Sequence, residues 1–497
     1  MGLKSFFSIP FAKYIVWKNN RWKYNALFYQ KRIFHSLIKT AKKTRFGKDH
    51  SFSKIKSYND WKTNIPIRDY EGLQEYISLV KKGVRDVLWP GKPIYFCKTS
   101  GTTSGTKYIP ITDDSMPHHI VAARDAILTY LAESKKYALV NKKMIFIQGS
   151  PVLTNTNGIL TGRLSGIVAH HVPSYLTKNR LPKLKTNSID DWEKKINSIV
   201  NETCTEDLSL IAGIPPWVQM YFEKLKEKTG SLIKDIFPNF ELFIYGGVNY
   251  KPYKNIIEKL IGKKVDGVEL YPASEGFIAY QDSQSEKGLL LCVNHGIFYE
   301  FVEADDFKNG SLERVSLSGV KIGVNYVIIL STNAGLWGYN IGDTVKFISL
   351  NPYKIIVTGR IKHFTSAFGE HVIAEEVESA INECVLEVPA NIVEFHVAPL
   401  VDTKNELPYH EWFIEFEKAP DDVLLFSKIL DQKLQNHNPY YKDLIQGGVL
   451  QFLKITLIRK NGFRLYMDSI GKLGGQNKVP RLANNRVIAD KLSKFVK

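Results

Sequence analysis

The arrangement of apolar and polar positions predicts alternating helices and strands in the first half of the chain. Residues 1–90 are predicted as helices with polar joints between them. A turn signal at residues 90–93 precedes a short apolar run that is typical of a strand. We expect short buried strands at residues 94–97, 144–148 and 241–245, and helices at residues 122–133 and 217–228. Strands that alternate with helices indicate a layered α/β core.

Residues 288–357 have a different, β-rich character. Strands are predicted at residues 289–293, 297–302, 326–330, 344–350 and 354–357. Turn signals at residues 294–296 and 309–310 lie between the first and second and between the second and third of these strands. This pattern predicts an antiparallel barrel or sheet that closes a large domain.

After Gly359 and Arg360 the β-rich pattern ends, and helices again alternate with strands. Helices are expected at residues 374–384 and 421–437, and strands at residues 392–397, 410–416 and 451–458. This combination predicts a small α+β domain of strands backed by two helices. We place the boundary near residues 359–361.

Length and composition fit a globular protein of two or more domains. The chain has 497 residues, too many for one hydrophobic core, with 44% hydrophobic and 24% charged residues. Its four cysteines are far apart and form neither a CxxC pair nor a Cys/His cluster, so we expect no disulfide framework and no structural zinc site. We expect a reducing, cytoplasmic location. No apolar run reaches membrane-spanning length, and the first residues do not resemble a signal peptide.

The net charge of +17 has a local source near the N-terminus. Residues 13–48 are rich in Lys and Arg, and five aromatic residues lie among them: Trp17, Trp22, Tyr24, Phe28 and Tyr29. One interpretation is a surface for nucleic acid or membrane. The other is an amphipathic helix pair whose aromatic residues face the core and whose lysines face water. We favour the second, because no nucleic-acid module accompanies the charge, and we expect neither nucleic-acid binding nor stable membrane insertion.

The motif with the clearest chemistry is TSGTTSGTK, formed by Thr99, Ser100, Gly101, Thr102, Thr103, Ser104, Gly105, Thr106 and Lys107. Glycines allow tight turns that direct backbone N–H groups inward, hydroxyls add donors, and Lys107 adds a positive charge. These features together suit a polyphosphate. The spacing differs from that of a Walker A loop, because the two glycines are one residue too close and Thr106 separates Gly105 from the lysine.

Two further motifs follow along the chain. In YPASEG, residues 271–276, Tyr271 offers a flat face for a base, Ser274 can donate to a phosphate, and Glu275 is suited to hold Mg²⁺. In YNIGDTV, residues 339–345, Asp343 can accept hydrogen bonds from both ribose hydroxyls. Either motif alone is more often an ordinary turn.

In this order and at these separations, the three motifs resemble the acyl-adenylate-forming superfamily of acyl-CoA synthetases, luciferases and peptide-synthetase adenylation domains. The likeness is strongest to the auxin-responsive acyl-acid amido synthetase family, whose members join plant hormones to amino acids. It extends from the phosphate-loop motif to NKVPR at residues 477–481. The resemblance implies a large N-terminal adenylate-forming domain, layered α/β with a β-barrel-like part, over residues 1–358. A hinge at residues 359–362 and a small mobile α+β domain over residues 363–497 would follow.

The resemblance also implies roles for individual residues. The loop from Thr99 to Lys107 would hold the β- and γ-phosphates of ATP, and Glu275 would hold Mg²⁺. Ser274 would approach the α-phosphate. The remaining nucleotide contacts would come from Gly246, Gly247 and Val248 beside the adenine, Tyr271 against the adenine, and Asp343 and Arg360 at the ribose.

The sequence departs from the family pattern in three respects. Lys107 lies one residue earlier than the phosphate-loop lysine of the plant enzymes, and Lys362 stands near the hinge where many superfamily members have an acid. The catalytic lysine of the C-terminal domain has two candidates. Lys478 fits the Lys-x-Pro-Arg ending of the plant family, whereas Lys472 resembles the Gly-Lys of CoA ligases. We favour Lys478, and a solvated tail charge remains the alternative for either.

The implied activity is that of a ligase with two half-reactions. A carboxylic acid would attack the α-phosphorus of ATP, giving an acyl-adenylate and pyrophosphate, and an amino-acid amine would then take the acyl group. The acceptor could instead be the thiol of coenzyme A or of a carrier protein. Two alternatives of another class are a non-catalytic ATP-binding protein and a nucleic-acid-binding protein.

Overall fold

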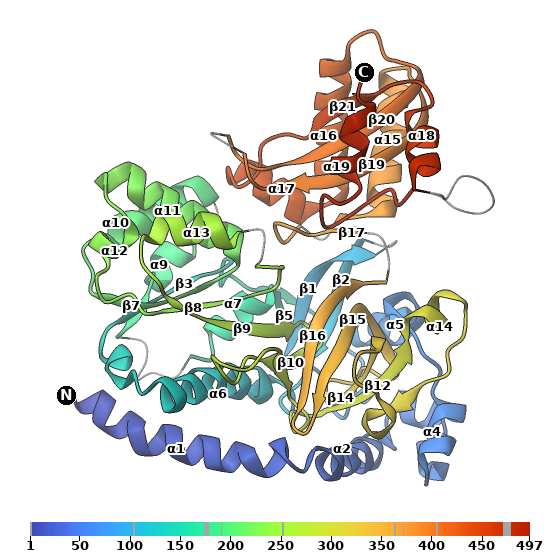
Figure 1. The fold of residues 1–497 in the computed structure, drawn as a ribbon. Coiled ribbons are helices and arrows are strands. Elements are labelled where there is room, and N and C mark those ends of the chain that lie inside the picture. Colours follow the sequence, from blue (N-terminus) through green and yellow to red (C-terminus); the bar gives the residue numbers. More distant parts are fainter. Residues whose placement is uncertain are drawn as a thin grey trace.

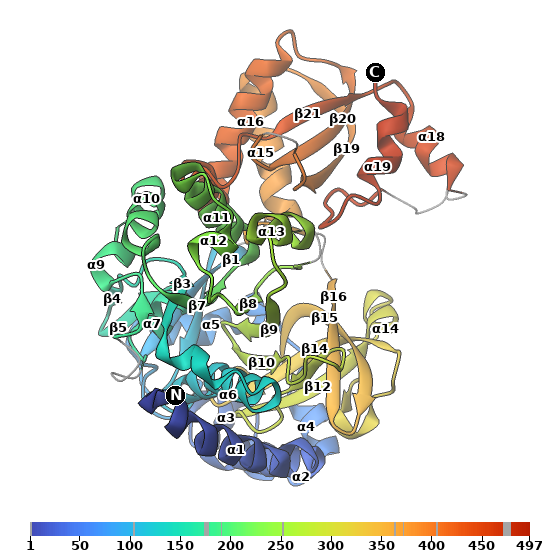
Figure 2. The same ribbon diagram turned by 60° about the vertical axis from the view of Figure 1, so that its left-hand side comes forward.

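The computed structural model describes residues 2–102, 105–172, 178–189, 191–250, 253–361, 364–370, 372–403, 406–470 and 479–497. Figures 1 and 2 show two regions, a large one and a smaller C-terminal one that packs against one end of it. The fold is mixed α/β with a smaller α+β region at the C-terminus, as predicted.

Helices make up the first part of the large region, as predicted. They are α1 (Leu3–Lys23), α2 (Ala26–Ala41), α3 (Arg45–Asp49), α4 (Tyr58–Asn64) and α5 (Tyr70–Lys81), with a 3-10 turn η1 (Phe52–Lys54). Ser57 and Asp60 form a capping box at the start of α4, and the Asp69 side chain caps α5 by accepting from the N–H of Gly72.

The aromatic residues of α1 and α2 do not all face the core, so our expectation for this helix pair was wrong in part. Trp22 is buried and Tyr29 is partly buried, but Trp17, Tyr24 and Phe28 are exposed. The buried face of α1 is the narrower one formed by residues such as Ala12, Ile15 and Asn19. Both faces of the helix therefore carry apolar side chains, and periodicity alone could not show which face the protein covers.

One mixed sheet of twelve strands forms the framework of the large region. In order across the sheet, the strands are β13 (Val315–Ser316), β12 (Ile297–Glu303), β14 (Asn325–Thr332), β15 (Tyr339–Leu350), β16 (Tyr353–Arg360), β11 (Leu289–Leu291), β10 (Gly276–Tyr280), β9 (Asp266–Ala273), β8 (Leu242–Gly246), β7 (Leu208–Gly213), β3 (Lys143–Ile147) and β6 (Arg180–Leu181).

The half of the sheet from β6 to β9 is parallel. Helices connect its strands, which is why these strands are short apolar runs without strict alternation. The helices around this half are α6 (Met116–Ser134), α7 (Leu164–Ala169), α9 (Leu184–Asn187), α10 (Trp192–Thr203), α11 (Pro215–Thr229), α12 (Ile233–Ile236) and α13 (Lys254–Ile261), with the 3-10 turn η2 (Tyr137–Asn141).

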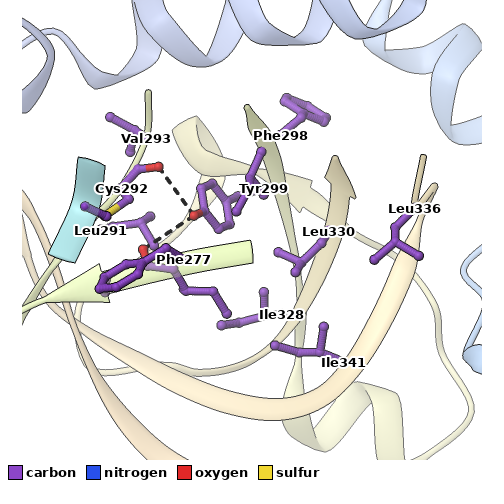
Figure 3. Packing of buried hydrophobic residues seen from close by; sticks show 14 of the residues in the cluster. Phe277, Leu291, Cys292, Val293, Phe298, Tyr299, Ile328, Leu330, Leu336 and Ile341 are labelled. Atoms are coloured by element: carbon purple, nitrogen blue, oxygen red, sulfur yellow. Dashed lines mark hydrogen bonds between the residues drawn. The ribbon is translucent and has the colours of Figure 1, made fainter. Parts of the chain in front are cut away.

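The β-rich segment continues this same sheet as its antiparallel half, joined through the β9–β10 hairpin. Its strands curl in Figure 1 around a core that Figure 3 shows from close by. Tyr299 points into this core, and its hydroxyl lies 3.4 Å from the carbonyl oxygens of both Ile278 and Cys292. Two short helical elements, α14 (Ala304–Lys308) and η3 (Leu317–Gly319), complete this half.

The side chain of Gln30 joins the N-terminal helices to this core. It is buried on α2, and its amide group donates to the carbonyl oxygens of Val293 and Ile297 at 2.9 and 2.8 Å. Its oxygen accepts from the N–H of Tyr299 at 2.9 Å. Because all three interactions are made in the interior, they fix α2 over the end of β12.

A separate four-stranded sheet lies beside the large one, with the order β2-β1-β5-β4. Its strands are β1 (Tyr95–Thr102), β2 (Gly105–Ile111), β4 (Thr154–Thr156) and β5 (Ile159–Gly162). The strand predicted at residues 94–97 is therefore longer than expected.

The C-terminal region contains the two predicted helices and all three predicted strands. The sheet has the order β19-β20-β21, from β19 (Asn391–Leu400), β20 (Tyr409–Lys418) and β21 (Lys454–Ile458), and a small hairpin pairs β17 (Phe364–Thr365) with β18 (Val372–Ile373). The helices are α15 (Ala374–Glu387), α16 (Val423–His437), α17 (Pro439–Gln446), α18 (Gly462–Ser469) and α19 (Ala489–Leu492), with a 3-10 turn η4 (Ser493–Phe495). Within the described ranges, no helix is long and apolar enough to cross a bilayer.

Candidate active site

Two of the predicted nucleotide-binding segments lie at the carboxyl ends of neighbouring parallel strands. Gly246 is the last residue of β8, and it pairs in register with Leu270 of β9, next to Tyr271. A β-carbon at position 246 would lie 2.3 Å from the carbonyl oxygen of Leu270, so only glycine fits there. Gly247 has a φ of +82°, which also favours glycine. Gly246, Gly247 and Val248 therefore lie beside Tyr271 at the carboxyl edge of the parallel strands, the edge where α/β folds commonly bind ligands.

Ser274 and Glu275 form the turn between β9 and β10, since Ala273 and Gly276 on either side of them are paired. The thiol of Cys97 on β1 donates to the Ser274 hydroxyl, with a sulfur–oxygen distance of 3.1 Å. Burial raises the pKa of Cys97 to about 12, so the thiol remains protonated and can donate. This contact brings β1 against the turn that presents Glu275.

The phosphate-loop motif forms a β-hairpin rather than an open loop. Thr99 pairs with Lys107 and Thr102 with Gly105, with an irregularity in the ladder between these pairs. Ser100 and Gly101 belong to β1 at this irregularity, where the strand departs from regular pairing. Thr103 and Ser104 lie outside the described residues. The segment expected as a loop is therefore largely strand, because the backbone of Thr99 and Thr102 still pairs with that of Lys107 and Gly105.

Lys107 and Glu275 are close enough to influence one another's ionisation. Burial lowers the pKa of the Lys107 ammonium, an effect that the Glu275 carboxylate opposes and Arg360 reinforces. Burial likewise raises the pKa of Glu275, and the charges of Lys107 and Arg360 oppose that shift. The site thus holds opposite charges together in a partly desolvated place, where each interacts more strongly than in water.

Asp343 is the centre of a second group of side chains. The Tyr271 hydroxyl donates to its Oδ2 at 2.6 Å, and Nε of Arg360 forms an ion pair with its Oδ1. Asp343 on β15 and Arg360 at the end of β16 are direct partners in the ladder. Each carboxylate oxygen has two lone pairs, so Asp343 retains capacity to accept further hydrogen bonds.

The structure adds residues to this site that the sequence did not indicate. The charges of Glu71 and Asp69, at the start of α5, act on Lys107. The neighbouring Tyr70 hydroxyl accepts from the N–H of Tyr108 at 2.9 Å, which holds α5 against β2. Tyr339 is fully buried, and the Glu275 carboxylate helps to raise the pKa of its phenol, after burial itself. Sequence reasoning missed Asp69 because it looks like an ordinary helix cap, and no local pattern connects it with the motif that begins at Thr99.

The C-terminal region contacts the strand that carries the phosphate-loop motif. The Tyr440 hydroxyl on α17 donates to the carbonyl oxygen of Lys98 at 2.8 Å. Arg163 forms an ion pair with Asp443, and its guanidinium carbon lies 4.2 Å from the centroid of the Tyr440 ring. A further contact joins the two regions, because the Tyr253 hydroxyl donates to the carbonyl oxygen of Ala367 at 2.5 Å.

The two candidate catalytic lysines, Lys472 and Lys478, lie outside the described residues, as does Lys362. The structure therefore brings together Lys107, Glu275, Tyr271, Asp343 and Arg360, with the Gly246–Val248 segment beside them. Within the described ranges, no group of three His, Cys, Asp or Glu side chains could form a metal site by itself.

Three family models match the chain in the order of their domains. They are the N-terminal domain of the GH3 family at residues 20–188, its central domain at residues 290–360 and its C-terminal domain at residues 375–487. The fold and these matches define an adenylate-forming ligase. The chain belongs to the GH3 family, the auxin-responsive acyl-acid amido synthetase family, and the resemblance drawn from its motifs is confirmed. Ligases of this family use ATP.

Relatives and solved structures agree with this membership at low identity. The chain is 20% identical to the indole-3-acetic acid-amido synthetase GH3.3 of Arabidopsis thaliana, over 95% of this chain and 92% of that protein. The acyl acid amido synthetase AtGH3.15, solved in complex with 2,4-DB, has a similar fold at 14% identity, with a TM-score of 0.60 and 98% and 96% of the two chains covered. A 2-hydroxyisobutyryl-CoA ligase has a similar fold at 13% identity, with a TM-score of 0.58 and coverage of 94% and 91%.

Proposed function

We propose that this protein activates a carboxylic acid with ATP and then joins the acyl group to the amine of an amino acid. In the first half-reaction, a carboxylate oxygen of the acid attacks the α-phosphorus, and the bond to the β-phosphate oxygen breaks. The products are an acyl-adenylate and pyrophosphate. In the second, the amine attacks the acyl carbon, AMP leaves, and the nitrogen gives up a proton.

The observation that carries the proposal is the convergence of Lys107, Glu275 and the Tyr271–Asp343–Arg360 group at one edge of the sheet. We assign Lys107 and the hairpin from Thr99 to Gly105 to the β- and γ-phosphates, and Ser274 to the α-phosphate. Asp343 and Arg360 are assigned to the ribose, and Tyr271 with Gly246, Gly247 and Val248 to the adenine. Such a site works by positioning ATP and spreading its negative charge.

We propose that Glu275 holds Mg²⁺ when ATP is bound. Magnesium prefers oxygen ligands and commonly takes one or two carboxylates together with substrate phosphates. Within the described residues no group of three His, Cys, Asp or Glu side chains could hold a metal, which is compatible with this pattern because a complete protein cage is not required. Bound Mg²⁺ would neutralise charge on the phosphate oxygens.

Two observations bear on the acceptor. Similarity to the Arabidopsis amido synthetase over 95% of the chain favours an amine. The fold likeness to the CoA ligase supports a thiol as the second candidate, that of coenzyme A or a carrier protein.

We also propose that residues 1–358 form the adenylation domain, residues 359–362 a hinge and residues 363–497 a mobile domain that supplies Lys478. Gly359 is suited to a hinge because its φ of +145° lies where side chains are disfavoured. All four cysteines are free thiols, which supports the expectation of a reducing, cytoplasmic location.

The test is a two-step screen of the full-length protein. Acid-dependent exchange of labelled pyrophosphate into ATP is measured across aryl, indolyl and fatty acids. Each acid that supports exchange is then incubated with ATP and either mixed amino acids or coenzyme A, and the products are identified by mass spectrometry. Formation of acyl amides without acyl-CoA supports the proposal. Formation of acyl-CoA alone would show that the acceptor is a thiol. Absence of exchange with every acid, in a protein shown to bind ATP, would contradict adenylation.

A further inference from the structure

An exposed row of aromatic side chains runs along α1. We call Phe6, Phe7, Phe11, Tyr14 and Trp17 the aromatic face; each is between 40% and 61% exposed. Tyr24 and Phe28 extend it towards α2. Among the residues that the structure describes, Phe452 is the one other aromatic side chain of comparable exposure. Apolar surface concentrated in this way commonly marks a contact with another body.

The aromatic face is not the result of a loosely attached helix. The opposite face of α1 packs on α6, and the Asn19 side-chain amide donates to Asp125 at 2.9 Å in the interior. Near the N-terminus, the Ser5 N–H donates to the Asn141 side-chain oxygen at 3.3 Å. Since residues 12, 15, 19 and 22 already cover the core, the helix has no further use for aromatic residues on its outer side.

The same surface is strongly basic. Residues 1–48 contain twelve Lys and Arg residues and no Asp or Glu, so most of the net charge of +17 comes from this segment. Lys13, Lys18 and Arg21 are exposed on the same side of α1 as the aromatic face. The Arg21 guanidinium carbon lies 4.0 Å from the centroid of the Trp17 ring. Basic and aromatic side chains are thus interleaved, not segregated.

We propose that the aromatic face and its basic residues form a docking surface for an anionic lipid bilayer. A helix that lies flat on a bilayer inserts aromatic rings at the level of the headgroups, while Lys and Arg bind the acidic lipids. The 21-residue helix would present roughly 30 Å of such a surface. No described helix can span a bilayer, so the contact is a peripheral one.

Charge and shape favour a bilayer over two other possible partners, a second copy of the chain and a nucleic acid. A second copy of the chain would bring two acid-free basic segments together, which is electrostatically unfavourable. Single-stranded nucleic acid is usually held in a basic groove where aromatic residues stack on bases, whereas these rings stand on the convex outside of a helix. Phenylalanine, present three times in this face, offers no hydrogen bond to a base.

Docking through this surface is compatible with the candidate active site. Figures 1 and 2 both show α1 and α2 along one end of the molecule and the C-terminal region at the opposite end. A bilayer beneath α1 would therefore leave the C-terminal region in water. The inference is independent of the proposed reaction, because it uses none of the residues assigned to ATP.

The experiment is a co-sedimentation assay of the full-length protein with vesicles. One set contains phosphatidylcholine alone and the other an equimolar mixture with phosphatidylserine. We expect binding to the mixed vesicles only, and its loss at about 0.5 M salt, where screening is strong. The variant Lys13→Glu with Lys18→Glu should bind at least about fivefold more weakly for each charge removed. The variant Phe7→Ala with Tyr14→Ala and Trp17→Ala should also lose at least about tenfold, because the inserted apolar area is gone.

Matched controls lie on exposed positions elsewhere. Lys226→Glu with Lys259→Glu makes the same charge change on α11 and α13, and Phe452→Ala removes the one other exposed aromatic ring. Both should bind vesicles like the parent, and all variants should melt at the parent temperature. Trp17→Phe should retain binding while losing the part of the tryptophan fluorescence that brominated lipids quench.

Several results would overturn the proposal. One is the absence of binding to mixed vesicles, and another is equal weakening by the control and α1 variants. If the parent instead forms a dimer that the aromatic variant dissociates, without vesicle binding, the face is a self-association surface. If RNA binds at physiological salt and vesicles do not, the surface is a nucleic-acid one.

Discussion

Tyr271 donates a hydrogen bond of 2.6 Å to Asp343, although 72 residues separate them in the chain. The bond joins the last parallel strand of the sheet to the antiparallel half. Arg360 completes the arrangement from the neighbouring strand. These contacts make the proposed ribose site a product of the whole sheet, so each partner can be tested through the others.

Tyr271→Phe should raise the KM for ATP by about three- to tenfold, the effect of losing one hydrogen bond of about 1 kcal/mol. Asp343→Ala should raise it further, because it leaves both Tyr271 and Arg360 without this partner. The parent should use dATP less well than ATP. Pyrophosphate exchange measures all three effects, with Tyr353→Phe on β16 as the control. Equal use of ATP and dATP by the parent would contradict the ribose assignment.

Lys107→Ala should lower adenylation by at least about a hundredfold without changing the melting temperature, since the side chain supplies charge at the site rather than core packing. The pKa of Lys107 is lowered by burial, so activity should fall with rising pH earlier than for an ordinary lysine. Lys107→Arg keeps its charge at all accessible pH values and should shift this alkaline limb upward. If Lys107→Arg loses activity at the same alkaline pH as the parent, the titrating group is not Lys107.

Glu275→Gln should raise the Mg²⁺ concentration needed for half-maximal pyrophosphate exchange, because the neutral amide binds the cation weakly. Burial raises the pKa of Glu275, and its active form is the carboxylate. The parent should therefore lose activity as pH falls through this raised pKa, above the pH expected for an exposed glutamate. Glu286→Gln, at an exposed position of the same large region, is the control and should change neither curve.

Tyr440→Phe with Asp443→Ala removes the hydrogen bond to Lys98 and the ion pair to Arg163. If the C-terminal domain alternates between two positions, loss of contacts made in only one of them should change the two half-reactions unequally, by a few-fold. Pyrophosphate exchange reports the first half-reaction, and transfer from supplied acyl-adenylate reports the second. A proportional loss in both would show that these contacts serve only stability.

Lys478→Ala should abolish acyl-adenylate formation yet retain transfer from supplied acyl-adenylate, since the lysine would act only in the adenylation arrangement. Lys472→Ala should have much less effect and is the matched control. A defect confined to Lys472→Ala would favour the alignment with CoA ligases. If neither substitution affects adenylation, the C-terminal domain does not close over the site as proposed.

Local pattern was sufficient for most elements of this fold. The predicted helix at residues 217–228 lies within α11, and the predicted strand at residues 241–245 nearly coincides with β8, because apolar spacing reports the period of the backbone directly. The three motifs also contain most of the residues that the structure brings together. YPASEG combines the end of β9 with a turn, whereas YNIGDTV forms the first part of β15.

The sequence by itself therefore determined the class of fold, the family and the principal candidate residues. Tertiary structure alone decided how distant segments meet: Asp69 and Glu71 near Lys107, Tyr440 on Lys98, and the phosphate motif as a paired hairpin. It also decided that Trp17 and Phe28 face outward. Periodicity shows that a helix has an apolar face, but only packing against other elements shows whether the protein covers that face.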